Sequence, residues 1–492
     1  MEGSIWRIDG QDQGIPTRIF IQPAATSRAL HLMCLFEFKQ SSDSNCDEAT
    51  FTSTKFRSTI LRVLENWATR MSSTTTSLTD LTIGSRLMVS GQPDGACSNM
   101  NVYLSPNFEL QRRYLSLDNL AAIWGGRVDI PPCTEFDQLI SLYRLDENVS
   151  VVSSENTLWQ GPAIFKGCTK GIARMYHEIR LLLQLPPHAN IVSKPIFLVT
   201  RAERGCDKPI VCGYIIPYFD GGTLEALINR TSWAEISQRQ RLKWSRQILS
   251  ALRHILERGH TYYSELKPDN ILLSHGGEMV LTDFEQSGNW AHWFPPPIAE
   301  PPFHSPGYYP HRSFATVVEE NEEVIAWHES SINPSKMVAG IHYSNRAAGY
   351  WKDFGLSSAY QQENYMVYLF AKILWCIFEW QTHRDSRLWK VGIGSSEADG
   401  PGADKKNGLF PAFVGQRTPQ QIQHWIWLAT RDSPGWEDKQ CNCAIVQMEW
   451  EICGDSGAAF AVSQSPENII GISRPSLEQL EKVLESIECE TK

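Results

Sequence analysis

The sequence lacks two features that mark whole classes of protein. No apolar run of about 18 residues or more occurs, as a membrane-spanning helix would need. The closest stretch, Tyr365 to Trp380, is shorter and contains Lys372. No Lys-rich or Arg-rich block is present, and the net charge of the 492 residues is -10. We therefore expect a protein that neither crosses a membrane nor binds nucleic acid.

Signals for secretion and for metal binding by cysteine are also missing. The N-terminus, which begins Met1-Glu2-Gly3, lacks the charged and then apolar pattern of a secretory signal. The 12 cysteines are scattered, and the one cluster, Cys441, Cys443 and Cys453, contains no CxxC pair. Scattered cysteines of this kind indicate reduced core residues rather than zinc ligands. The sequence predicts an intracellular protein, cytoplasmic or nuclear.

Residues 1 to about 135 form the first compositional region. Strands are expected at Thr17–Gln22 and Leu30–Phe38. Apolar residues between Phe56 and Met71 recur at helical spacing and predict an amphipathic helix. Nothing catalytic stands out here. The region predicts an accessory α+β domain of unknown role.

The pattern changes near residue 136. Residues 136–222 predict a small lobe of five strands with one helix, Ile172–Leu185, after the third strand. The strands are expected at Leu139–Arg144, Val149–Ser153, Pro162–Lys166, Ile191–Thr200 and Val211–Tyr218. Residues 223–492 are mostly helical in pattern and are interrupted by a long, Pro-rich insertion at about 286–362.

The chemistry of the chain is concentrated in one stretch. Tyr263 to Leu273 reads Tyr-Ser-Glu-Leu-Lys-Pro-Asp-Asn-Ile-Leu-Leu, and Leu281-Thr282-Asp283-Phe284-Glu285 follows it. Two carboxylates and one amide at this spacing can hold magnesium and direct a hydroxyl group. A lysine between them can neutralise a phosphate in transfer. The spacing therefore indicates phosphoryl transfer.

These motifs resemble those of the eukaryotic protein kinase superfamily. The run Asp283-Phe284-Glu285-Gln286 is also similar to that of fungal protein-kinase-domain proteins in which DFEQ stands in place of DFG. The resemblance covers about 140–490. It implies a two-lobed α+β fold with a small β-rich lobe and a large helical lobe. It also implies ATP and Mg²⁺ as cofactors and a protein as substrate or binding partner.

Upstream of the main motif, the resemblance implies a set of nucleotide contacts. Lys166, in Ala163-Ile164-Phe165-Lys166, would bind the α- and β-phosphates. Glu178, on the helix that follows, would pair with this lysine and hold it in place. The backbone after the fifth strand resembles the hinge that reads the edge of adenine. The residues expected around the base are Ile164, Ile216, Tyr218 and Leu272.

In the catalytic loop, the resemblance implies four roles. Asn270 and Asp283 would bind Mg²⁺, and Lys267 would contact the transferring phosphate. Glu265 stands at the position of the catalytic Asp and would orient the hydroxyl group. The expectation of Ser/Thr rather than Tyr as acceptor rests on Lys267 alone.

The catalytic loop also departs from the family pattern. Glu265 is one methylene longer than Asp, so its carboxylate would be displaced by roughly 1 Å, which can cost ~100-fold in rate. Tyr263-Ser264 replaces the usual His-Arg. The loss of that arginine removes the usual anchor for a phosphorylated activation loop.

Further departures lie around the nucleotide. Between the first and third strands of the lobe only Gly161 is present, so the glycine-rich cover over the phosphates is missing. Ile164 replaces a small Ala beside the base, and Glu285 replaces a Gly that would permit backbone flips. The Ala-Pro-Glu motif is absent, and Glu300 is the candidate partner for Arg474.

Three functions remain open from the sequence. The intact phosphate and metal motifs favour an ATP-dependent protein kinase directed to Ser or Thr. The departures favour a pseudokinase that acts as a binding or scaffolding module. The Asp-Phe-Glu variant leans towards a small-molecule phosphotransferase, whereas the turn His188 to Val192 and the Arg474-Pro475 helix start lean towards protein kinases.

Overall fold

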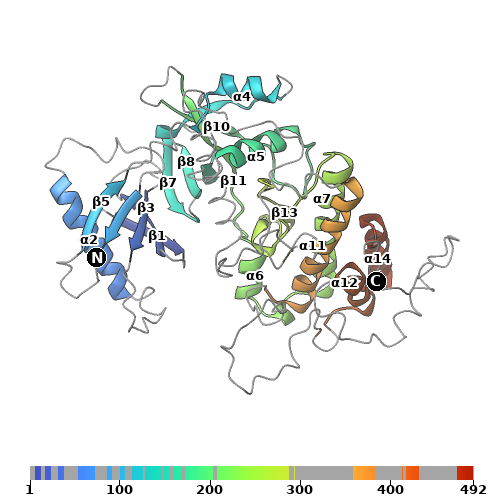
Figure 1. The fold of residues 1–492 in the computed structure, drawn as a ribbon. Coiled ribbons are helices and arrows are strands. Elements are labelled where there is room, and N and C mark those ends of the chain that lie inside the picture. The colour runs from blue at the N-terminus through green and yellow to red at the C-terminus, as the bar shows by residue number, and fades with distance from the viewer. Residues whose placement is uncertain are drawn as a thin grey trace, which may run out of the picture. The chain divides into compact units, whose positions relative to one another are not determined.

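The protein is represented by a computed structural model. It describes residues 6–12, 17–23, 32–37, 54–71, 86–90, 100–105, 113–125, 128–146, 148–154, 159–167, 172–202, 208–286, 293, 358–382, 413, 417–430 and 474–490. These residues form two compact units (Figure 1). The first contains the described residues up to Gln184 together with Ser193–Tyr218. The second contains Leu185–Val192 and the described residues from Phe219 onward.

The N-terminal part of the first unit contains a five-stranded sheet. Its strands lie in chain order: β1 (Trp6–Asp12), β2 (Thr17–Pro23), β3 (Leu32–Glu37), β4 (Arg86–Ser90) and β5 (Asn101–Ser105). Strands β3 and β4 are parallel, and helix α2 (Thr54–Met71) connects them. The apolar side of α2 packs on the sheet. Trp67 of α2 contacts Trp6 of β1, with ring centroids 6.2 Å apart. The sequence predicted α2, β2 and β3 and missed the other three strands.

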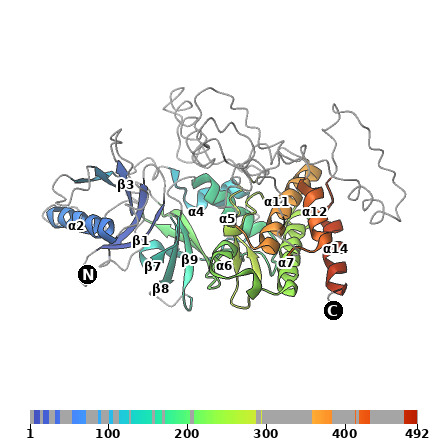
Figure 2. The same cartoon turned by 90° about the horizontal axis from the view of Figure 1, so that it is seen from below.

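A six-stranded sheet forms the rest of the first unit (Figure 2). Its order is β6-β10-β11-β9-β8-β7, and only β6 and β10 pair in parallel. Helix α5 (Ile172–Gln184) follows β9 in the chain, and a short helix, α4 (Leu117–Trp124), precedes β6. The strand bounds are β6 (Cys133–Glu135), β7 (Leu139–Arg144), β8 (Val149–Ser154), β9 (Ala163–Gly167), β10 (Phe197–Arg201) and β11 (Ile210–Pro217).

The fourth predicted strand begins six residues later than expected, at Phe197 instead of Ile191. Its expected start is used elsewhere, because Ile191 forms a parallel bridge with Leu281. The backbone N–H of Val192 also donates to the carbonyl of Leu281 at 2.9 Å. These two residues therefore belong to the second unit, and the apolar pattern of 191–200 spans two separate elements.

Two glycines fix the position of β9 in its sheet. The ring of Phe165 occupies the space where side chains at positions 167 and 213 would stand. A Cβ at Gly167 would lie 2.3 Å from Phe165 Cζ, and one at Gly213 would lie 2.4 Å from Phe165 Cε2. The ring also packs on Phe136, with centroids 5.6 Å apart. Phe165 thus anchors one face of β9 while its neighbours Ile164 and Lys166 point to the other face.

The second unit is largely helical. Helix α11 (Ala359–Glu379) is buried from Met366 to its end. Helices α7 (Gln238–Glu257) and α12 (Gln420–Thr430) pack against it, and α14 (Leu477–Glu490) packs against both α7 and α12 (Figure 1). A short helix α6 (Leu224–Arg230) and the hairpin β12 (Ile271–Leu273) and β13 (Met279–Leu281) complete it. Within the described residues, no helix is long and apolar enough to cross a membrane.

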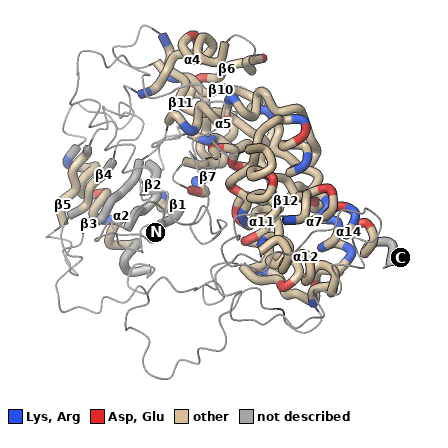
Figure 3. The backbone as a smooth tube through the Cα atoms, turned by 45° about the vertical axis from the view of Figure 1, so that its right-hand side comes forward, with Lys and Arg blue, Asp and Glu red and all other residues tan. Residues whose placement is uncertain are grey.

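Lys, Arg, Asp and Glu residues recur along α7 and α14 (Figure 3). Arg253 on α7 pairs with Glu257 at 2.8 Å and also with Glu481 on α14. Most of the predicted insertion at about 286–362 lies outside the described residues, as do Glu300 and the cysteines 441, 443 and 453. The expected pairing of Glu300 with Arg474 and the cysteine cluster are therefore untested.

A buried arginine joins α7 to the turn before it and to the end of α11. Arg241 is 2% exposed and lies 4.4 Å from the ring centroid of Trp233 and 5.7 Å from that of Trp380. Its guanidinium donates a hydrogen bond to the carbonyl of Trp233. Burial lowers the pKa of Arg241 to about 10, as does the charge of Arg417, while the fully buried Glu379 acts in the opposite direction. Arg241 therefore remains charged at neutral pH.

Replacement of Arg241 by Met is expected to lower the free energy of unfolding of the second unit by about 3 kcal/mol. The change leaves the carboxylate of Glu379 buried without this cation and removes the contacts to two indole rings. Urea unfolding followed by circular dichroism measures the loss. Arg239→Met, at an exposed position of the same helix, is the matched control. Equal stability of the two variants would contradict the role assigned to Arg241.

Candidate active site

Lys166 is placed by β9 and oriented by α5. Its Nζ lies 2.7 Å from Glu178 Oε2, and the two side chains are 13% and 2% exposed. A charge-assisted hydrogen bond of this length, with little access to water, holds the ammonium group in one position. The structure thus brings together the two residues that the sequence predicted as a pair.

The predicted base-contacting residues of the first unit are neighbours on the same face as Lys166. Ile164 stands directly opposite Val151 on β8 and Ile216 on β11. Side chains of directly opposite residues share a face, and residues two apart along a strand do so as well. Ile164 is 8% exposed and Ile216 is 5% exposed. Tyr218 follows the end of β11, and its hydroxyl oxygen lies 2.9 Å from that of Tyr143 on β7.

The catalytic loop of the second unit is organised by the Asn270 side chain. Its Nδ2 donates to the backbone carbonyl of Glu265 at 3.0 Å and to Asp283 Oδ2 at 3.2 Å. A 3-10 turn, Pro268–Asn270, places this amide, and the N–H of Thr282 donates to the carbonyl of Asn270 at 3.1 Å. The two predicted metal ligands therefore lie side by side. Leu272, on β12 directly after the turn, is only partly buried.

Lys267 lies among three carboxylates. Its Nζ is 3.5 Å from Asp269 Oδ2, and its side chain is 17% exposed. Burial on its own lowers the pKa of Lys267, but the charges of Asp269, Glu265 and Asp283 outweigh it and hold that pKa above its ordinary value. Lys267 is therefore a firmly charged cation at neutral pH.

Glu265 is almost completely enclosed, with 3% of its surface exposed. Burial, together with the charge of Glu265, raises the pKa of the neighbouring Tyr262 well above its ordinary value. Ser264, which stands where the family has Arg, is fully buried, and its hydroxyl oxygen has no hydrogen-bond partner within the described part of the chain. The loop is thus buried at all three positions where it departs from the family pattern, Tyr263, Ser264 and Glu265.

Asp283 adopts a conformation that is uncommon for a residue with a side chain. Its φ is 65°, in the left-handed region. The surrounding contacts hold it there: the hydroxyl of Tyr263 donates to the carbonyl of Thr282, and the rings of Tyr263 and Phe284 lie 4.9 Å apart. Tyr263, which replaces the family's His, therefore links the loop to the Asp283 segment. The sequence signalled the substitution but not this contact.

Gln286 is a residue whose role the sequence did not reveal. It is 1% exposed and has a φ of 52°. Its Nε2 donates to the carbonyl of Tyr262 at 2.6 Å and is 3.1 Å from the hydroxyl oxygen of Thr261. The Gln of the Asp-Phe-Glu-Gln run therefore ties this segment back to the start of the catalytic loop. The only signal in the sequence was the place of Gln286 directly after the Asp-Phe-Glu motif.

Met366 on α11 supplies a second anchor that the sequence did not indicate. The backbone N–H of Tyr263 lies 3.4 Å from its sulfur atom, and Met366 is fully buried. A thioether is a weak acceptor. The loop is therefore attached to the central helix mainly by packing rather than by a strong hydrogen bond at this point.

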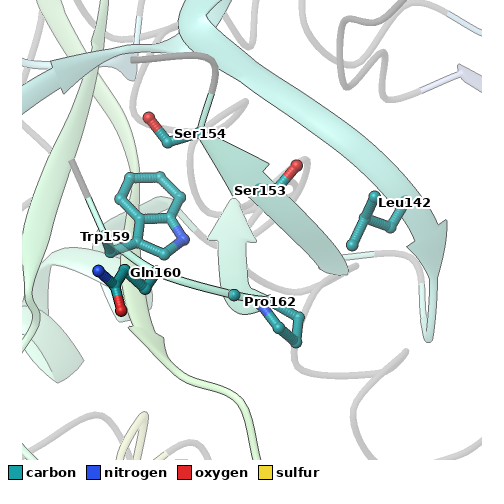
Figure 4. A pocket seen from close by; sticks show the side chains of 7 residues that line it. Leu142, Ser153, Ser154, Trp159, Gln160 and Pro162 are labelled. Atoms are coloured by element: carbon teal, nitrogen blue, oxygen red, sulfur yellow. The ribbon is translucent and has the colours of Figure 1, made fainter. Parts of the chain in front are cut away.

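A cavity of about 560 Å³ lies at the edge of the six-stranded sheet (Figure 4). Its described lining consists of Leu142, Ser153, Ser154, Trp159, Gln160, Gly161 and Pro162. None of the predicted site residues lines it. Its lining comes from β7, from the end of β8 and from the residues just before β9.

Comparison with known proteins agrees with this geometry. Residues 165–296 match the protein kinase domain family. The chain is 28% identical over 143 residues to serine/threonine-protein kinase UCNL of Arabidopsis thaliana, which covers 29% of this chain and 34% of that relative. It is 29% identical over 122 residues to serine/threonine-protein kinase UCN of the same plant, covering 25% of this chain and 29% of that relative.

The chain thus spans about a third of the length of these two relatives, at 34% and 29%. The likeness of the Asp-Phe-Glu-Gln run to fungal proteins remains a prediction. The matched residues 165–296 include Lys166, Glu178, Asn270 and Asp283, which are the residues that the structure pairs. On these grounds, the chain contains a protein kinase domain of the eukaryotic protein kinase superfamily.

Proposed function

We propose that this chain transfers the γ-phosphoryl group of ATP, with Mg²⁺, to a Ser or Thr hydroxyl of a protein. The kinase domain match and the likeness to two serine/threonine-protein kinases support this proposal. The observation that carries it is the Asn270 amide, which is held against Asp283 beside a charged Lys267.

The donor groups present fit a magnesium ion. Mg²⁺ prefers oxygen ligands and is commonly held by one or two carboxylates together with phosphate oxygens. Asp283 offers a carboxylate, and Asn270 uses its amide nitrogen for both of its bonds in the loop, so its amide oxygen is left over from them. When bound, Mg²⁺ neutralises the charge that develops on the phosphate groups.

The remaining residues have separate tasks in the proposed reaction. Lys166, held by Glu178, binds phosphate oxygens of ATP. Lys267 donates hydrogen bonds to the phosphoryl group in transfer. The substrate hydroxyl oxygen forms a bond to the γ-phosphorus while the bond from that phosphorus to the ADP oxygen breaks. The hydroxyl proton passes to the carboxylate of Glu265.

Replacement of Asp283 by Ala is expected to reduce phosphate transfer at least about 100-fold. The change removes the carboxylate that would hold Mg²⁺ against the phosphates of ATP. Transfer of radiolabelled phosphate from ATP to a generic Ser/Thr substrate, or to the chain itself, measures it. Glu485→Ala, which removes an exposed carboxylate of the same unit, is the control. The same signal from wild type and Asp283→Ala would refute the proposal.

Shortening Glu265 to Asp is expected to raise kcat about tenfold or more without changing KM for ATP. The carboxylate then reaches the position that the family uses, and it does not touch the nucleotide. Glu265→Gln keeps the length but cannot accept a proton, and its kcat should fall below that of the wild type. Steady-state kinetics measure kcat and KM for both variants. A drop in kcat for Glu265→Asp would contradict the role assigned to Glu265.

A second function, a pseudokinase used as a binding module, is favoured by the burial of the altered positions. Ile164 is bulkier than the family's Ala and leaves less room for a base beside Lys166. Glu265 is almost completely buried. Thermal unfolding with millimolar Mg-ATP separates the two functions, because a ligand that binds the folded state raises its stability. We expect the melting temperature to rise in the wild type and to rise less in Lys166→Ala. No rise in either protein would favour the pseudokinase.

A further inference from the structure

The hydroxyl groups of Tyr143 and Tyr218 form a bridge across the six-stranded sheet. Their oxygen atoms are 2.9 Å apart. Tyr143 lies on β7, at the edge of the sheet, and Tyr218 follows β11. Strands β8 and β9 stand between β7 and β11. The two side chains must therefore reach towards each other past these two strands.

The strand register identifies what lies beside this bridge. Tyr143 is opposite Val151, Val151 is opposite Ile164, and Ile164 is opposite Ile216. These residues form one row on the face that carries Lys166. Val151 is fully buried and Ile164 is 8% exposed, whereas Tyr143, at the β7 end of the row, is 39% exposed.

The same register gives the position of the bridge along β9. Tyr214 is opposite Lys166, and Ile216 is opposite Ile164. Tyr218 lies two residues further in the same direction. The bridge therefore runs from the row itself, at Tyr143, to Tyr218 on the side of the row that faces away from Lys166. A nucleotide base would lie on that side if its phosphates were held by Lys166.

A backbone hydrogen bond lies next to the bridge: just after β7, the N–H of Leu145 donates to the carbonyl of Val149 at 2.9 Å. The hydrogen bond to Tyr218, followed by burial and the charge of Tyr218, raises the pKa of Tyr143 to about 12. The hydroxyl of Tyr143 is thus protonated at neutral pH and able to donate to Tyr218.

We propose that the Tyr143–Tyr218 hydrogen bond is a latch that must open before a nucleotide base can lie against Val151 and Ile164. This inference rests on the proposed function, because it assumes that Lys166 binds nucleotide phosphates. A protein whose binding-competent form is a minority has a correspondingly lower apparent affinity. One such hydrogen bond is expected to weaken nucleotide binding by about threefold to tenfold.

Two conservative variants test the latch. Tyr143→Phe and Tyr218→Phe keep both rings and lose the bond. Each is expected to bind Mg-ATP about threefold to tenfold more tightly than the wild type in calorimetric titration. The double variant should gain no more than either single one, because all three lose the same bond. Tyr103→Phe, at a 47% exposed tyrosine of β5, should bind like the wild type.

Amide hydrogen exchange without nucleotide provides a readout that is independent of ATP. Exchange of residues 142–151 should be about threefold to tenfold faster in both Phe variants and unchanged in Tyr103→Phe. If the exchange rates in the two Phe variants equal those of the wild type, the latch is refuted, whatever the affinity for ATP. Faster exchange with equal or weaker ATP binding would overturn its effect on nucleotides. Absence of ATP binding in every protein, wild type included, would instead refute the proposed function and with it the role of the latch.

Discussion

The positive charge of Lys267 is the constraint on which the catalytic loop depends. Three carboxylates, Asp269, Glu265 and Asp283, act on this one ammonium group and hold its pKa above the ordinary value. Glu265 is 3% exposed, and the side chain of Asp269 is 31% exposed. Like charges this close repel each other, and a cation between them offsets that repulsion. The Asn270 amide joins the same segments, because it donates to the backbone carbonyl of Glu265 and to the carboxylate of Asp283.

Residues of this domain that differ from the family pattern make new contacts in place of those that the family residues would make. Tyr263 cannot act as the family's His does, yet its hydroxyl and its ring hold the Asp283 segment. Gln286 follows the altered Glu285 and binds the loop backbone. A sequence that breaks a local rule at a functional site and restores the lost contacts nearby retains a defined structure there. The divergence is therefore compatible with an ordered site.

The sequence predicted more of the fold than of the contacts within the site. The strand that carries Lys166 and the helix that carries Glu178 were recognised. The prediction failed at Ile191–Thr200, where one apolar run serves two elements. An apolar pattern records burial but does not record which neighbour buries it.

The contacts made by Tyr263, Gln286 and Met366 escaped prediction for a related reason. Each joins a side chain to a backbone group, and a backbone group leaves no trace in the sequence. The Lys166–Glu178 pair, in contrast, joins two charged side chains at a spacing that the family motif records. Motif spacing therefore identified the residues with opposite charges, whereas the support around them became visible only in three dimensions.

The ring of Phe165 has a consequence for how this site can evolve. Because it fills the space above Gly167 and Gly213, β9 cannot slide along its neighbours without a clash. Lys166 and Ile164 are thus kept opposite Tyr214 and Ile216 of β11. Mutation can change the size of these side chains but not which of them stand opposite each other. Change on this face is therefore expected through side-chain size rather than through a shift of register.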